Sequence, residues 1–120
     1  MKPKIDSTNF GSITVAGETF NHDILIRLNG QVEEREKALS KEVYGTSHKI
    51  SLDEAKYIYE NETEKIIIGT GQTGFVELSE EAEDFFIEKK CGIELFPTPL
   101  AIDRWNEMEG RISAMFHVTC

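Results

Sequence analysis

Hydrophobic and polar residues alternate along the first third of the chain, with the period of two that is typical of β-strands. The segment "SITVAGETFNHDILIRLNGQVEER", residues 12–35, places two sets of side chains on opposite faces. One set is Phe20, His22, Ile24, Ile26 and Leu28, and the other is Asn21, Asp23, Leu25 and Arg27. Ala16-Gly17 and Asn29-Gly30 are turn signals, and the second is typical of a hairpin. We therefore expect an antiparallel meander of about three strands here.

The period of the pattern changes near residue 50. Residues 38–50, "ALSKEVYGTSHKI", match no regular period and are expected to form a loop. Ser51 and Glu54 then form a capping box, in which each side chain satisfies a backbone donor of the other at a helix start. Apolar residues at helical spacing follow, which predicts a helix that buries one stripe.

Two more helices and two more strands are predicted in the last third. Ser79 caps a helix in "SEEAEDFFIEKK", residues 79–90, and Gly92 is suited to its left-handed stop. "GIELF", residues 92–96, reads as a buried strand. Thr98-Pro99 opens a helix with Thr98 as its N-cap, and "RISAMFHVT", residues 111–119, reads as the last strand.

This order of elements predicts an α/β fold. We expect residues 1–120 to form a single compact domain. Its mixed sheet would contain the N-terminal antiparallel meander, followed by three helix–strand units.

The overall charge narrows the classes of partner. The chain has 120 residues and a net charge of −9, from 22 acidic and 13 basic side chains. Such a surface repels phosphate backbones and anionic lipid, so we expect no nucleic-acid binding and no membrane binding. The longest purely apolar run is Ile66-Ile67-Ile68, far shorter than a membrane span.

The cysteines and the start of the chain indicate the compartment. Cys91 and Cys120 have neither metal-site nor disulfide spacing, and free thiols suit a reducing environment. The start, "MKPKIDSTNFGS", lacks the apolar stretch of a signal peptide. We therefore expect a cytoplasmic protein.

The segment "KIIIGTGQTGFVELS", residues 65–79, resembles a dinucleotide fingerprint at first sight, because Gly69, Gly71 and Gly74 follow an apolar run. In that motif the third glycine opens the helix. Here the helix cap is Ser79, five residues after Gly74, and the helix begins with carboxylates that would repel a diphosphate. We therefore interpret the glycines as a turn and expect no nucleotide cofactor.

The same turn is the basis of an alternative, a small anionic ligand or an enzyme site. Open α/β sheets bind ligands at the carboxyl ends of their strands. Backbone amides of the turn would be the anion donors. The candidate residues for this site are His48, Gly69, Thr70, Gly71, Gln72, Thr98 and His117.

The histidines give weak indications of chemistry. In the closing "HVTC", alternation places His117 and Thr119 on one face and Cys120 on the other, which argues against a Cys-His pair. We expect His117 to be partly buried and satisfied by backbone or hydroxyl groups, and His48 to be the more exposed. A general acid/base role for either stays open. No spacing asks for a metal, so we predict no metal site and no catalytic residue.

Several blocks of the sequence resemble a known family. These are "FGSITVAG", "GTSH", "IIIGTGQ", "PTPLAIDRWN" and "FHVTC", in this order over nearly the whole chain. The family is that of small uncharacterised α/β domains related to the adipogenesis-associated domain protein and a mitochondrial complex I assembly factor. Its matching positions are Gly69, Gly71, Thr98, Ala101, Asn106, His117, Thr119 and Cys120.

The resemblance implies a compact α/β fold with a mixed sheet, no established activity, metal or cofactor, and assembly or regulatory roles. The leading prediction is therefore a cytoplasmic binding or assembly module without catalysis of its own. Its partners would be proteins, or a small anionic ligand in the alternative, and the chain would be a monomer or a weak homo-oligomer.

Overall fold

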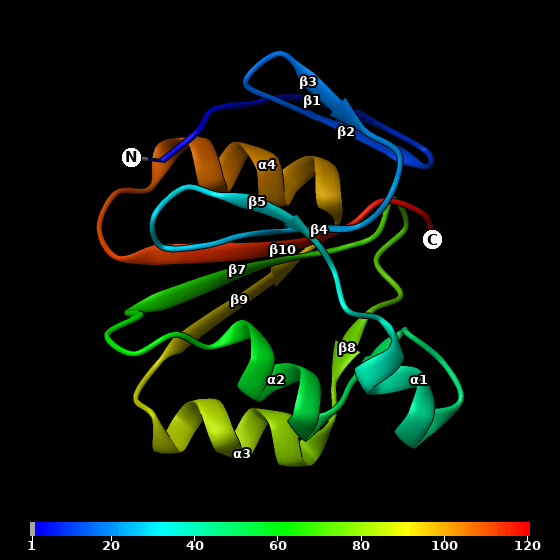
Figure 1. Ribbon diagram of the computed structural model, residues 1–120, viewed down its shortest axis with the longest axis vertical. Coiled ribbons are helices and arrows are strands. Elements are labelled where there is room, and N and C mark those ends of the chain that lie inside the picture. Colours follow the sequence, from blue (N-terminus) through cyan, green and yellow to red (C-terminus); the bar gives the residue numbers. More distant parts are fainter. Residues whose placement is uncertain (1) are drawn as a thin grey trace.

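The computed structural model describes residues 2–120, and in that range the chain forms an α/β domain with a mixed sheet at its centre (Figure 1). The strands are β1 Ile5–Asn9, β2 Ser12–Val15, β3 Glu18–Phe20, β4 Ile24–Ile26, β5 Val32–Glu34, β6 Lys49–Ile50, β7 Lys65–Thr70, β8 Glu77–Leu78, β9 Gly92–Phe96 and β10 Ile112–His117. The helices are α1 Ala38–Tyr44, α2 Leu52–Ile58, α3 Glu80–Glu88 and α4 Thr98–Glu107. None of these helices is long and apolar enough to cross a bilayer.

The central sheet has five strands in the order β5-β4-β10-β7-β9. β10 pairs in parallel with β7, where Ala114 lies opposite Ile67, and antiparallel with β4, where Ala114 lies opposite Ile26. β9 pairs in parallel with the other side of β7 and forms one edge of the sheet. The predicted mixed sheet and the three helix–strand units, α2-β7, α3-β9 and α4-β10, are confirmed.

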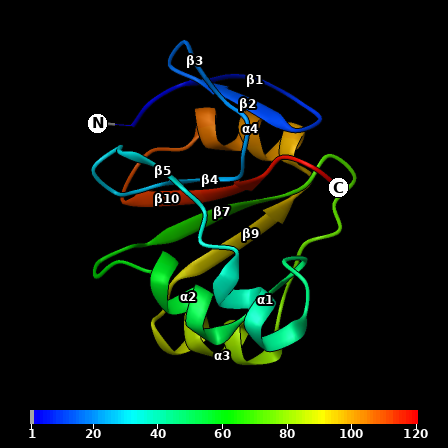
Figure 2. The same cartoon turned by 45° about the vertical axis from the view of Figure 1, so that its right-hand side comes forward.

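The predicted meander, residues 12–35, is divided between two sheets. Its first part, β2 and β3, pairs with β1 in a separate sheet of order β1-β2-β3, which lies over α4 and which we call the meander (Figures 1 and 2). The predicted turn at Ala16-Gly17 joins β2 to β3, and both residues have positive φ. The predicted hairpin at Asn29-Gly30 joins β4 to β5 within the central sheet. The first third of the chain therefore contributes to two sheets.

Two hydrophobic cores lie on opposite faces of the central sheet. The core toward α4 contains Ile24, Ile26, Ala101, Trp105 and Phe116 among its buried residues. The other core, toward α2 and α3, is built around side chains of the opposite parity and includes Leu25, Ile66, Ile68, Phe86 and Met115. The alternation seen in residues 20–28 thus separates the two cores as the period of two requires.

Several local predictions were wrong. Residues 38–44 are helical rather than part of a loop, and β6 follows them. β9 is a half-exposed edge strand rather than a buried one. The left-handed residue after α3 is Lys90, with φ of 56°, whereas Gly92 is the first residue of β9.

Two predicted caps also differ in their details. The Ser51 hydroxyl accepts the Glu54 N–H at 3.1 Å, but the Ser51 N–H donates to Ser40 Oγ, so Glu54 does not complete the box. Pro97 occupies the N-cap position of α4, and no side chain caps this helix. The Thr98 hydroxyl has other partners, described below. The Ser79 cap of α3 is confirmed by the Ala82 N–H, 3.1 Å from Ser79 Oγ.

Candidate functional site

The carboxyl ends of β7 and β10 bring most of the predicted site residues together. Thr70 lies opposite His117 in the parallel ladder. The Thr98 hydroxyl donates to the His117 carbonyl at 2.6 Å and accepts the Gly71 N–H at 3.0 Å. The rings of His48 and His117 meet edge to face, with centroids 5.3 Å apart. Residues far apart in the sequence therefore converge at this end of the sheet.

The glycine turn is held by the last residues of the chain. Gly71 has φ of 109°, and the Gln72 N–H donates to the Thr119 carbonyl at 2.7 Å. The Phe75 N–H donates to the Cys120 carbonyl at 3.4 Å. With the Gly71 N–H bonded to Thr98, these three amides are used internally. The anion site stays a prediction, but an anion at this turn could not use these three N–H groups as donors.

Gly69 and Gln72 also make internal contacts. A Cβ on Gly69 would lie 2.7 Å from the Phe116 ring and 2.9 Å from Thr98 Oγ1, so packing explains this glycine. The Gln72 amide donates to Thr8 Oγ1 at 3.0 Å and to the Asn9 carbonyl at 3.1 Å. Gln72 therefore joins the meander to the central sheet.

A buried carboxylate that the sequence reasoning did not select, Asp23, organises this region. Its Oδ2 accepts from His117 Nδ1 at 2.7 Å and from the Arg35 guanidinium at 2.9 Å, and its Oδ1 accepts the Val118 N–H at 2.9 Å. Burial alone would raise the pKa of Asp23, but these hydrogen bonds and charges outweigh it and lower the pKa to about 2. Asp23 is therefore ionised, and His117 Nδ1 carries the proton between them.

Arg35 links this carboxylate to a second one on α2. Its Nε donates to Glu54 Oε2 at 2.6 Å and its second terminal nitrogen to Glu54 Oε1 at 3.0 Å, a bidentate pair. The same nitrogen donates to the Ser47 carbonyl at 2.7 Å. The Ser40 hydroxyl donates to Glu54 as well. This polar network joins the residue before β4 and the residue after β5 to β10, α1 and α2, and we call it the Arg35 network.

The Arg35 network contains a carboxylate, an imidazole and a hydroxyl in the order of a charge relay, since His117 Nε2 lies 3.1 Å from Thr119 Oγ1. His117 is only 1% exposed, and Asp23 and Glu54 are equally buried. The prediction that backbone or hydroxyl groups satisfy His117 was incomplete, because the carboxylate is its main partner. A signal for this existed, since Asp23 shares one face of the strand pattern with the apolar Leu25. The hydrogen bonds of the Arg35 network fix the ring and hold the elements together.

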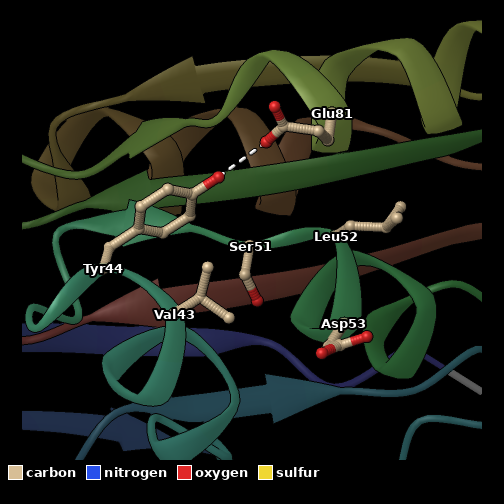
Figure 3. A pocket seen from close by; sticks show the side chains of 6 residues that line it. All are labelled: Val43, Tyr44, Ser51, Leu52, Asp53 and Glu81. Carbon is tan, nitrogen blue, oxygen red and sulfur yellow. Dashed lines mark hydrogen bonds between the residues drawn. The ribbon is translucent and has the colours of Figure 1, made fainter.

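The helical layer contains an open groove along α1, α2 and α3. Its first part is a pocket of about 410 Å³ lined by Val43, Tyr44, Ser51, Leu52, Asp53 and Glu81. Figure 3 shows Tyr44 of α1 extending toward Glu81 of α3, and its hydroxyl donates to Glu81 Oε2 at 2.6 Å. A second pocket of about 380 Å³ is lined by Leu52, Lys56, Glu81, Asp84, Phe85 and Glu88. The two pockets share Leu52 and Glu81, and we call them together the helical groove.

The helical groove combines apolar and acidic side chains. Val43 is 55% exposed, and Leu52 and Phe85 are half-buried. Four carboxylates line the groove, those of Asp53, Glu81, Asp84 and Glu88, together with Lys56. Lys49 and Lys89 lie over the rings of Tyr44 and Phe85. The hydrogen bond from Tyr44 lowers the pKa of Glu81. The groove therefore offers apolar contact area within a negative potential.

Within residues 2–120, no group of three or more His, Cys, Asp or Glu side chains is arranged to hold a metal ion. Cys91 and Cys120 are both unpaired. Burial raises the pKa of the Cys91 thiol to about 11.

Most of the chain matches one family of proteins. Residues 5–117 match the family described as "Protein of unknown function (DUF498/DUF598)", and the chain belongs to it. The chain is similar to the conserved hypothetical protein PH1505 from Pyrococcus horikoshii OT3, at 34% identity and a TM-score of 0.91, covering 98% of this chain and 99% of that one. It is also similar to the structure titled "MT938", at 33% identity and a TM-score of 0.85, covering 99% and 100%.

A more distant structure shows the fold alone. A protein from Bordetella pertussis, described as a Mth938-like domain, is 15% identical with a TM-score of 0.64, covering 97% of this chain and 85% of that one. No curated protein matches the chain. These relatives establish the family and the Mth938-like fold.

Proposed function

We propose that the protein is a binding or assembly module that docks a partner protein in the helical groove and performs no catalysis of its own. The observation that carries the proposal is the groove itself, where apolar side chains lie exposed between three helices. In the Arg35 network and in the glycine turn, by contrast, the polar groups described above form hydrogen bonds within the protein. Exposed apolar area within a polar rim is typical of protein docking sites.

Two further observations support the proposal. The sequence blocks that resemble the adipogenesis-associated domain protein and the complex I assembly factor point to an assembly role rather than to turnover of a substrate. The unpaired cysteines suit a reducing compartment, and we place the binding in the cytoplasm.

In-cell photocrosslinking tests the proposed docking. A photoreactive phenylalanine analogue at Val43 lies in the helical groove, and the same analogue at Glu18 on β3 lies at the opposite side of the molecule. We expect a defined protein adduct from position 43 and none of that mass from position 18. Adding Leu52→Glu to the variant that carries the analogue at position 43 should remove the adduct. Adducts that are equal at both positions, or that survive Leu52→Glu, would refute docking in the groove.

A small anionic ligand beside His48 is the second candidate, because the partly exposed His48 ring lies against His117 at the strand ends. His48 would supply a cation or a proton to the anion. Titration with inorganic phosphate, followed by the ring resonances of both histidines, tests this candidate. Saturable shifts that His48→Ala abolishes would support it, and resonances that stay constant through the titration would remove it.

A further inference from the structure

We infer that the segment bound in the helical groove is a basic amphipathic helix, an inference that rests on the proposed docking function. The groove has a direction, because its two pockets follow one another along α2 and α3 and share Leu52 and Glu81. It therefore accepts a rod-like segment with two successive apolar anchors.

The chemistry of the groove wall favours a helix over a strand. An added strand needs free main-chain N–H and C=O groups at a sheet edge. Apart from Ser51, every residue that lines the two pockets belongs to α1, α2 or α3. The Ser51 N–H donates to Ser40, and its hydroxyl donates to the Leu39 carbonyl. The groove thus recognises side chains, which a helix presents at intervals of three and four residues.

The apolar floor supplies the anchoring contacts. Val43, Leu52 and Phe85 come from three different helices and line the two pockets between them. Burying such side chains contributes roughly 25 cal/mol for each Å² of apolar area removed from water. Leucine-sized side chains on one stripe of a partner helix fit this floor.

The acidic rim sets the sign of the partner's charge. Four carboxylates and Lys56 line the groove, and Glu80 and Glu83 on the first turn of α3 add to the same field. Lys49 and Lys89, over the rings of Tyr44 and Phe85, offset part of this charge, and the balance stays negative. A lysine-rich or arginine-rich face would be attracted, and an acidic helix of the same shape would be repelled. The charge pairs between the groove and its partner would be exposed to solvent, so salt would screen them. The Debye length is about 8 Å in 0.15 M salt and shorter at higher concentrations, so binding should weaken as salt is added.

The experiment uses three synthetic peptides of about 18 residues. The first has leucines at helical spacing and lysines elsewhere. The second replaces the lysines by glutamates, and the third scrambles the first so that its leucines have no period. Binding to the full chain is measured by fluorescence anisotropy at about 0.15 M and about 0.5 M NaCl.

Two charge-reversal variants locate the binding. Asp84→Lys/Glu88→Lys changes the groove, and Asp103→Lys/Glu107→Lys makes the same change in charge on exposed positions of α4, beyond the sheet (Figure 1). We expect the first variant to weaken binding of the lysine peptide by about tenfold or more and the second to change it by less than about twofold. Far-ultraviolet circular dichroism checks that both variants are folded.

Each remaining result decides against the inference. Equal weakening by both variants would mean attraction to the whole acidic surface, and equal binding of the scrambled peptide would rule out the helix. Equal binding of the glutamate peptide would rule out charge recognition. A dimer of the unmodified chain that Asp84→Lys/Glu88→Lys dissociates would identify a second copy as the occupant.

Competition separates this inference from the function on which it rests. If the lysine peptide, present before irradiation of a cell extract, prevents the adduct at Val43 from forming, both stand. An adduct at Val43 that forms equally well in the presence of the peptide leaves the docking function in place and refutes the partner class. If position 43 gives no specific adduct, the docking function fails, whatever the peptide binds.

Discussion

Replacing Arg35 by methionine should destabilise the protein far more than any exposed charge substitution. The Arg35 side chain is buried between Asp23 and Glu54, with donor–acceptor distances of 2.9 Å and 2.6 Å. Methionine keeps much of the apolar volume but leaves both buried carboxylates without their shared cation. Breaking a buried pair in this way costs about 3 to 5 kcal/mol.

That loss is measurable without unfolding the variant outright. A chain of this length has a total stability on the order of 6 to 18 kcal/mol. With a urea m value of about 2 kcal/mol per M, a loss of about 4 kcal/mol lowers the unfolding midpoint by about 2 M. Urea titrations at pH 7, followed by circular dichroism, give this shift directly.

The pH dependence identifies the cause as electrostatic. In the native protein the pKa of Asp23 is lowered from 3.8 to about 2, so its contribution of about 2 kcal/mol is present above pH 3.8 and lost as pH falls through about 2. In Arg35→Met, protonation of a buried carboxylate that has lost the guanidinium removes its desolvation cost. The difference in unfolding free energy between the two proteins should therefore shrink between pH 7 and pH 4.

Arg111→Met is the matched control. Arg111 pairs with Glu62 at 2.6 Å, but both side chains are 62% exposed, so its loss should cost less than about 1 kcal/mol. Equal losses for the two variants, or a difference that does not change with pH, would refute the account of Arg35 as a buried cation between two carboxylates.

Three further predictions concern single sites elsewhere. Ser113 Oγ is buried and has no hydrogen-bond partner within residues 2–120, so Ser113→Ala should leave the free energy of unfolding in urea unchanged or raise it by up to about 1 kcal/mol; a clear fall would reveal a missing partner. Gly71→Ala should lower the free energy of unfolding in urea by at least about 2 kcal/mol, because its Cβ would lie 2.5 Å from the Cys120 carbonyl oxygen. Gly17→Ala, with open space around it, should lower it by only about 1 kcal/mol. Equal losses would mean that the positive φ alone determines the cost. A thiol reagent should label Cys120 in the native protein and Cys91, 6% exposed, only in urea; rapid native labelling of both would contradict the burial of Cys91.

The parts of the fold that the sequence predicts are those with strong local signals. Alternation in residues 20–28 separates the two cores, and the serine caps of α2 and α3 locate two helix starts. The sequence does not predict α1, because this helix carries no such local signal. It has no capping side chain and no acidic residue in its first turn, and its one buried residue is the polar Ser40. A period of apolar residues cannot reveal a helix that buries a hydroxyl.

The candidate sites depend on contacts that no local pattern encodes. Asp23 and Glu54 are joined only because Arg35 lies between them in space. Threonine is a common N-cap residue, but the Thr98 hydroxyl donates to the His117 carbonyl and accepts the Gly71 N–H instead. The helical groove likewise needs three helices in their final positions, so the sequence predicts a binding module without showing its surface.

The position of β10 has a consequence for the order of synthesis. It is the middle strand of the five-stranded sheet, with β4 on one side and β7 on the other, although it is the last strand along the chain. Until residues 112–117 have left the ribosome, β4 and β7 have no strand between them and both cores stay open on that side. Nascent chains that end before Ile112 would therefore expose apolar strand edges, and the domain can close only after translation has passed its last strand.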